Sequence, residues 1–185
     1  MKKCFLIIAS SLLLSCNHTS KKNIENQKIV EKESRRFFDS DKIEHYHLNF
    51  SEDDFFKLRR TKRRSKKEEE LFKILVFSFP DSIPKADFEK ILLKHNYEKS
   101  NLSLQQQKKI ENVFSEKDSL KSDACSCIAE YRDIFIFKKN TKTVGIAKIC
   151  FKNARFQIVG SKLDTNGFGL WSELDKLQNI VDPKK

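Results

Sequence analysis

The feature that most constrains the fold is a pair of apolar segments in the C-terminal third of the chain. Residues 133–137 (DIFIF) are apolar on both faces, residues 138–143 are polar, and residues 144–151 (VGIAKICF) are apolar again. Two such segments around a short polar connection predict a β-hairpin in the centre of a sheet. Residues 155–159 (RFQIV) predict a third strand, so we expect an antiparallel meander.

The segments before this hairpin have mainly helical patterns. Ser51, followed by three acids, predicts a helix cap and a short helix over 52–62. Residues 71–79 (LFKILVFSF) fit either the end of a helix begun at Lys66 or a buried strand, and Pro80 favours the helix. Further helices are predicted over 84–97, opened by Pro84, over 103–115, and over 170–181.

These elements predict an α+β domain, with a helical N-terminal and middle part followed by a small antiparallel β-meander and a C-terminal helix. Only 38% of the residues are hydrophobic, yet 16 are phenylalanine, so we expect a small, aromatic core.

One strand is predicted ahead of the helices, over residues 42–50 (KIEHYHLNF). The alternation places His45 and His47 on the same face of that strand. Two imidazoles on one face make a metal site geometrically possible, although strand histidines are more often simply exposed. No third ligand is spaced nearby.

The first sixteen residues have the pattern of a secretory signal. Lys2 and Lys3 precede an apolar run over 5–14, which is too short to span a membrane and ends at Ser15 and Cys16. Leu13-Leu14-Ser15-Cys16 resembles the lipobox of bacterial lipoproteins, which implies cleavage before Cys16 and a diacylglycerol thioether on it. A signal cut elsewhere, or an uncleaved anchor, is the alternative.

Removing residues 1–15 takes away two lysines and no acid, so the formal charge falls from +11 to +9. Residues 16–36 are rich in Lys, Asn, Glu and Ser without a sustained apolar face, which predicts a flexible tether. Residues 37–182 are then expected to form a single domain. The absence of an acid directly after Cys16 resembles signals of outer-membrane lipoproteins, so we expect a periplasm-facing protein of the cell envelope.

The C-terminal half also resembles a family of small, functionally uncharacterised bacterial lipoproteins. The resemblance rests on Cys127-Ile128-Ala129-Glu130-Tyr131-Arg132-Asp133, on the apolar hairpin, and on Ile146-Ala147-Lys148-Ile149-Cys150-Phe151. It covers about residues 42–181 and implies no activity.

A basic run over residues 57–67 (KLRRTKRRSKK) has eight cations in eleven residues and is followed by three glutamates. A solvated helix end, neutralised by nearby acids, is one interpretation. The other is a contact for acidic envelope polymers or phosphorylated lipid. Nucleic acid is not expected as a partner, because no interleaved aromatic motif accompanies the charge. The candidate binding residues are Arg59, Arg60, Lys62, Arg63 and Arg64.

Three cysteines remain beside Cys16 after cleavage: Cys125, Cys127 and Cys150. If Phe137 lies opposite Val144, Cys150 lies opposite Tyr131, and the two cysteines before that residue are too far away for a simple cross-strand disulfide. A disulfide formed by chain reversal, free thiols, and a metal or thiol-redox site all remain open.

The chain offers no enzyme signature. With 4 glycines it has no Gly-rich phosphate loop, and it has no Gly-x-Ser-x-Gly or His-Glu-x-x-His motif. A hydrolase with scattered residues stays open. We expect a membrane-anchored lipoprotein, held in the bilayer by acylated Cys16, with a non-enzymatic binding or structural role and no cofactor.

Overall fold

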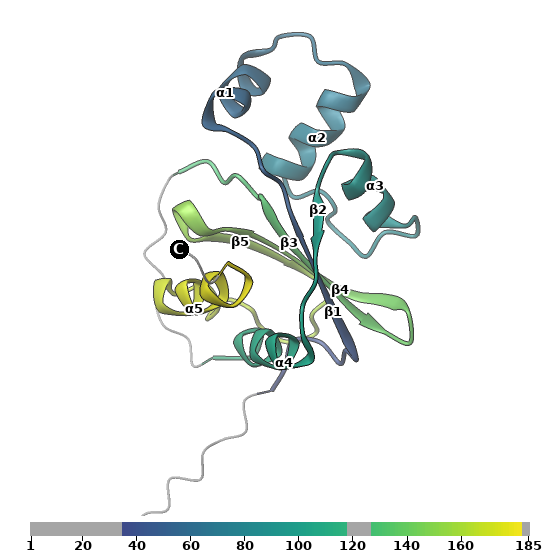
Figure 1. The fold of residues 1–185 in the computed structure, drawn as a ribbon, viewed down its shortest axis with the longest axis vertical. Coiled ribbons are helices and arrows are strands. Elements are labelled where there is room, and N and C mark those ends of the chain that lie inside the picture. Colours follow the sequence, from purple (N-terminus) through teal and green to yellow (C-terminus); the bar gives the residue numbers. More distant parts are fainter. Residues whose placement is uncertain (1–34, 118–126, 183–185) are drawn as a thin grey trace, which may run out of the picture. The chain divides into compact units, whose positions relative to one another are not determined.

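An antiparallel sheet in the order β2-β1-β3-β4-β5 forms the centre of the domain (Figure 1). The computed structural model describes residues 35–117 and 127–182. In chain order, the elements are β1 (Lys42–His47), α1 (Glu52–Arg60), α2 (Lys66–Val76), α3 (Phe88–Lys94), β2 (Glu98–Ser100), α4 (Leu104–Val113), β3 (Asp133–Lys139), β4 (Lys142–Cys150), the 3-10 turn η1 (Phe151–Asn153), β5 (Arg155–Val159) and α5 (Trp171–Val181).

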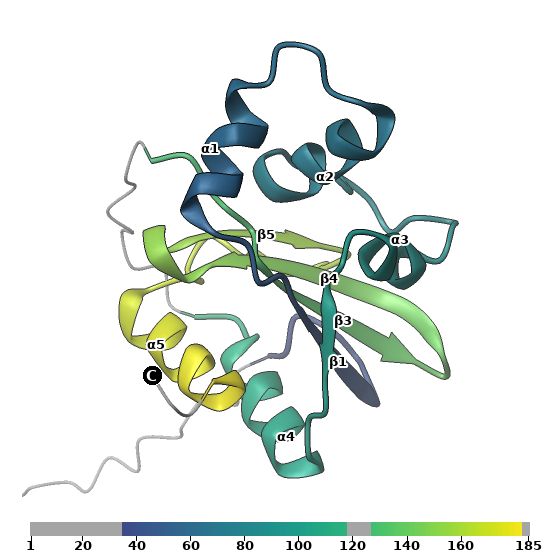
Figure 2. The same ribbon diagram turned by 45° about the horizontal axis from the view of Figure 1, so that its top comes forward.

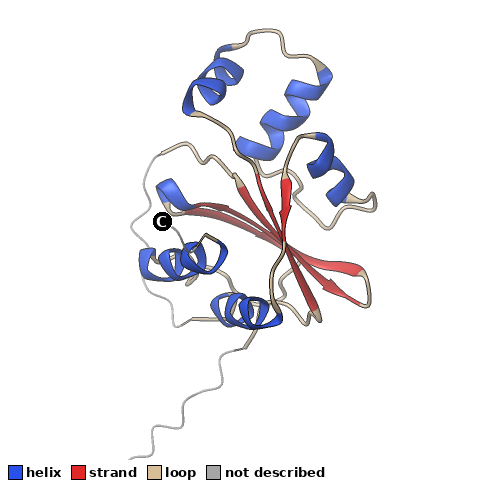
Figure 3. Cartoon of the chain, in the orientation of Figure 1, coloured by secondary structure: helices blue, strands red, loops and turns tan. Residues whose placement is uncertain are grey.

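Helices cover both faces of this sheet (Figures 2 and 3). On one face, residues of α4 and α5 such as Ile110 and Leu177 pack against Phe135 of β3. On the other face, residues of α1, α2 and α3 pack against β1, β3 and β4. The predicted α+β class is confirmed, and the burial of both faces explains why β3 has no polar alternation.

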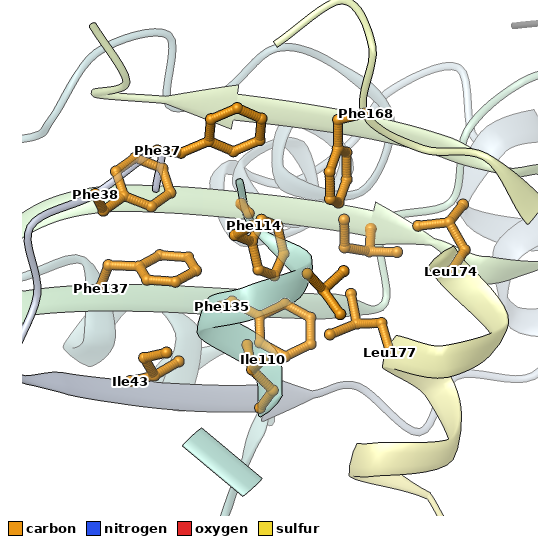
Figure 4. Close-up of a cluster of buried hydrophobic side chains, with 13 residues drawn as sticks. Phe37, Phe38, Ile43, Ile110, Phe114, Phe135, Phe137, Phe168, Leu174 and Leu177 are labelled. Carbon is orange, nitrogen blue, oxygen red and sulfur yellow. The ribbon is translucent and has the colours of Figure 1, made fainter. Parts of the chain in front are cut away.

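The face under α4 and α5 holds an aromatic cluster (Figure 4). The ring of Phe114 lies 4.9 Å from that of Phe168 and 5.0 Å from that of Phe137. Gly145 makes room for this packing, because a Cβ there would lie 2.3 Å from the ring of Phe38. Aromatic pairs at such distances stabilise a core beyond the area that they bury.

Serine and aspartate caps set where the helices begin. Ser51 caps α1 as predicted, and Ser65 and Ser103 form capping boxes at α2 and α4. The prediction that residues 71–79 end a helix is confirmed, since α2 ends at Val76. The helix predicted from Pro84 begins instead at Phe88, because Asp87 accepts the capping hydrogen bond from Lys90 N–H.

The predicted hairpin forms, but its register shifts along its length. Lys138 lies opposite Thr143, as the predicted pairing requires. Beyond the irregularity at this point, Phe137 lies opposite Gly145 rather than the predicted Val144. An extra residue in one strand moves all later pairs by one, and a strand that is apolar on both faces gives no sequence signal of the change.

Two strands from outside the meander extend the sheet. β1 pairs with β3, and the three-residue strand β2, which the sequence did not predict, pairs with β1 at the edge. None of the helices among the described residues combines the length and apolarity needed to cross a bilayer.

Candidate functional site

One carboxylate oxygen joins the two histidines that the sequence placed on one strand face. Asp133 Oδ1 lies 3.0 Å from His45 Nε2 and 2.8 Å from His47 Nδ1. Asp133 lies opposite His47 in the register, and His45 lies one position along the same face. The residue that connects the histidines thus comes from β3, far away in the sequence.

A serine extends this network to the edge of the sheet. Ser100 of β2 lies directly opposite His45, and its Oγ is 2.9 Å from His45 Nδ1. An ionised carboxylate only accepts hydrogen bonds, so His45 Nε2 carries a proton toward Asp133. In neutral His45, Nδ1 is then the acceptor and receives the hydroxyl proton of Ser100.

Burial and hydrogen bonding act in opposite directions on Asp133. Burial by itself would raise the pKa of this carboxyl, but the hydrogen bonds and charges of His45 and His47 hold its pKa below the usual value. Asp133 is therefore ionised at neutral pH. His45 is buried against the ring of Phe135 at 4.7 Å, whereas the side chain of His47 is 43% exposed.

Two hollows adjoin this polar network. A hollow of about 240 Å³ is lined by Ser100, His45, His47 and Asp133 from the sheet, together with residues of η1 and of the C-terminal end of α5. A hollow of about 320 Å³ shares His47 and Asp133 and extends toward Arg132 and Lys152. Phe151 and Gln178 line both. His47 and Asp133 of the network thus line both hollows.

The basic run forms a second candidate surface, made of the end of α1, the connecting loop and the start of α2. Seven of its eight cations are exposed. We call these seven the basic surface: Lys57, Arg59, Arg60, Lys62, Arg63, Lys66 and Lys67.

Of the three glutamates that follow the basic run, two have other hydrogen-bond partners and one pairs with Arg64 of the run itself. Glu68 accepts a hydrogen bond from the backbone of Ser65 in the capping box, and Glu70 pairs with Lys94 and His95. Glu69 pairs with Arg64 at 3.5 Å. Within the described part of the chain, none of the seven cations forms an ion pair, although hydrogen bonds from Ser65 and then the charges of Arg64 and Lys57 hold the pKa of Glu68 below its usual value.

Arg64 differs from the other predicted binding residues because its guanidinium makes contacts within the domain. It donates hydrogen bonds to the carbonyl oxygens of Leu58 and Arg59 at 2.9 Å and stacks 3.7 Å from the ring centroid of Phe72. It therefore caps the end of α1 and fixes the loop. Arg59, Arg60, Lys62 and Arg63 stay exposed around it.

Of the three cysteines that the sequence left open as ligands or disulfide partners, the structure describes Cys127 and Cys150. Cys127 is disulfide-bonded, whereas Cys150 is a free, buried thiol that packs with Ala129 and Tyr131, so no bond joins these two. Cys16 and Cys125 lie outside the described residues. Across residues 35–117 and 127–182, no three or more His, Cys, Asp or Glu side chains are arranged to hold a metal ion.

A buried ionic cluster lies on the opposite face of the sheet. Glu44 contacts the ammonium groups of Lys42, Lys99 and Lys138 within 3.1 Å and accepts a hydrogen bond from Tyr46. Burial opposes ionisation of Glu44, but the three lysines hold its pKa well below the usual range. Because the three lysines come from different strands, this cluster joins β1, β2 and β3.

Comparisons with protein-family models, curated proteins and solved structures give no match to this chain. The resemblance to small bacterial lipoproteins therefore stays a prediction. A function has to be inferred from the polar network and the basic surface themselves.

Proposed function

We propose that this protein is a lipoprotein of the cell envelope, anchored by acylated Cys16, whose folded domain binds phosphate-bearing anionic lipid through the basic surface. The supporting observation is the absence of ion pairs to these seven exposed cations within the described residues. Like charges held together repel one another, and Lys66 and Lys67 also lie at the N-terminal end of α2, where the helix dipole disfavours cations. Such an arrangement opposes folding and is better explained by an anionic partner.

The geometry of the loop suits an extended anionic surface. Because Arg64 caps α1 and stacks on Phe72, the backbone that carries the neighbouring cations is fixed, so only their side chains have to be ordered on binding. Phe56 is 44% exposed beside the guanidinium of Arg60, at 5.9 Å, and offers an aromatic ring to the headgroup region. Each cation close to an anionic membrane contributes about 1 kcal/mol.

The proposed anchor explains why lipid is the favoured partner. A tether at Cys16 keeps the domain close to one bilayer and raises the effective concentration of its headgroups. Lipidation combined with a cationic patch gives stable attachment. On this proposal the protein faces the periplasm from the outer membrane.

Charge reversal should show whether vesicle binding depends on the basic surface or only on the net charge of the chain. The variant Arg59→Glu, Arg60→Glu, Lys62→Glu, Arg63→Glu should bind anionic phospholipid vesicles at least about a hundredfold more weakly than the wild type, because several headgroup contacts are lost. The measurement is vesicle co-sedimentation at low salt of a chain that begins at Asn17 and so lacks the acyl anchor. Arg64 is left unchanged to preserve the loop.

A matched control changes the net charge equally at exposed lysines elsewhere: Lys85→Glu, Lys108→Glu, Lys109→Glu and Lys142→Glu. We expect this control to keep most of the binding. Equal loss in both variants would mean that only net charge matters. Binding to a soluble acidic polysaccharide but not to vesicles would replace lipid with a polymer as the partner. Salt near 0.5 M should weaken vesicle binding, since the Debye length falls to about 4 Å.

The anchor itself is tested at Cys16. Cys16→Ala should give a product that carries no labelled fatty acid and no longer fractionates with membranes, because the thiol that forms the thioether is gone. Cys150→Ala is a suitable comparison, since this thiol is buried in the domain. Undiminished label in the Cys16 variant would refute lipidation there.

A further inference from the structure

We propose that Ser100, His45 and Asp133 act as a nucleophile, a base and an orienting acid that hydrolyse small esters bound in the adjoining 240 Å³ hollow. This activity is independent of lipid binding at the basic surface. It rests on an unbroken hydrogen-bonded chain: Ser100 Oγ to His45 Nδ1 at 2.9 Å, and His45 Nε2 to Asp133 Oδ1 at 3.0 Å. Nucleophile, base and orienting group within such distances are the geometric signature of an activated serine.

Neighbouring strands of the sheet fix this geometry. Ser100 lies opposite His45 across β2 and β1, and Asp133 reaches His45 diagonally from β3. The ring of His45 is held against Phe135, so its orientation does not depend on a mobile loop. Asp133 remains ionised, because its hydrogen bonds from the histidines lower its pKa despite burial. It can therefore stabilise the imidazolium that forms when His45 accepts a proton.

The exposure of the three hydrogen-bonded residues suits their proposed roles as orienting acid, base and nucleophile. Asp133 and His45 are largely buried and Ser100, on the edge strand, is partly exposed; all three line the hollow. The hydroxyl of Ser100 is thus accessible to a ligand in the hollow, and His45 lies within hydrogen-bond distance of it. A buried polar network that served only to fix the sheet would not need to open onto a hollow.

The proposed reaction is a two-step acyl transfer to water. Ser100 Oγ attacks the ester carbonyl carbon, and its proton moves to His45 Nδ1. The bond between the carbonyl carbon and the alkoxy oxygen breaks, and the alcohol leaves with that proton. Water then attacks the acyl-serine ester, passing a proton to His45, which returns it to Ser100 as the carboxylic acid is released.

The lining of the hollow restricts the substrate. Its size admits a short acyl ester, and Phe151 and Val181 give it apolar walls. Glu98, Lys99 and Asp182 also line the hollow, so its charged groups are of both signs and a short neutral ester suits it. Gln178 also lines the hollow and carries an amide that can donate to the carbonyl oxygen as it becomes negative.

The test is covalent labelling of the full-length protein with a small alkyl fluorophosphonate, followed by peptide mapping. We expect label on Ser100 in the wild type and none at this position in Ser100→Ala. Ser82→Ala, which removes an exposed serine hydroxyl outside the hollow, should label like the wild type. Because the expected result is a modified residue in the wild-type protein, it does not depend on whether a variant folds.

Turnover of p-nitrophenyl acetate provides the second measurement. Ser100→Ala should reduce enzymatic hydrolysis at least about a hundredfold. Asp133 acts through His45, so Asp133→Asn should lower kcat about a hundredfold or more with little change in KM, whereas general damage to the hollow would raise KM as well. Failure of the wild type to label at Ser100, or equal hydrolysis by the wild type and Ser100→Ala, would overturn the proposal while leaving the lipid-binding function untouched.

Discussion

We expect the stability of the wild type to rise between pH 7 and pH 9.5, and we expect Lys148→Met to remove most of this rise. The ammonium of Lys148 is fully buried on β4, and burial lowers its pKa to about 7. Its Nζ donates hydrogen bonds to the carbonyl oxygens of Phe77 at 2.6 Å and Phe79 at 2.8 Å, which follow α2. A neutral amine has two N–H groups and can satisfy both carbonyls without a buried charge.

The sign follows from proton linkage. Below pH 7, Lys148 is charged in both the folded and the unfolded state, so it contributes no pH dependence. Above pH 7, the folded protein loses this proton while the unfolded chain, with a pKa near 10.5, keeps it. The unfolded state then binds more protons, and the free energy of unfolding rises by roughly 3 kcal/mol up to pH 9.5.

The measurement is urea unfolding of the wild type and Lys148→Met at pH 7 and 9.5. Lys142→Met, which replaces an exposed lysine on the same strand, should keep the wild-type rise. The pH range stops below 10 because burial raises the pKa of Tyr46 and Tyr97, so that stability falls again when the unfolded tyrosines ionise. The same pH dependence in the wild type and Lys148→Met would contradict the assignment.

Phe114→Ala should cost about 4 kcal/mol of stability. The ring is 1% exposed and lies within 5.5 Å of the rings of Phe135, Phe137 and Phe168, so its removal leaves a cavity between α4 and the sheet. Neighbouring rings at three sides limit how far this cavity can collapse.

Leu104→Ala provides the control at the other end of the same helix. Leu104 is 77% exposed, so we expect its truncation to change stability by less than about 0.5 kcal/mol. Both variants are compared by denaturant unfolding at one pH. A loss below about 1.5 kcal/mol for Phe114→Ala would show that the aromatic cluster repacks more freely than its ring contacts indicate.

The elements that the sequence predicted well are those set by local contacts. Ser51, Ser65 and Ser103 cap helices through hydrogen bonds to backbone groups three residues away, so a short window contains the whole signal. The helix predicted from Pro84 is the exception, because the capping residue is Asp87, which the sequence analysis did not single out. The strand period of two likewise placed His45 and His47 on one face.

The same distinction between local signals and long-range contacts applies to the two candidate sites. The position of the basic surface is evident from the sequence alone, because eight cations in eleven residues are recognised without any knowledge of their contacts. Which of these cations can bind a partner depends on the fold. Arg64 cannot, because its guanidinium stacks on Phe72 and donates to a carbonyl oxygen of α1. Tertiary structure also decided the polar network. Asp133 and Ser100 reach His45 only through the pairing of β1 with β3 and β2, and such long-range pairing leaves no periodic signal in a three-residue strand.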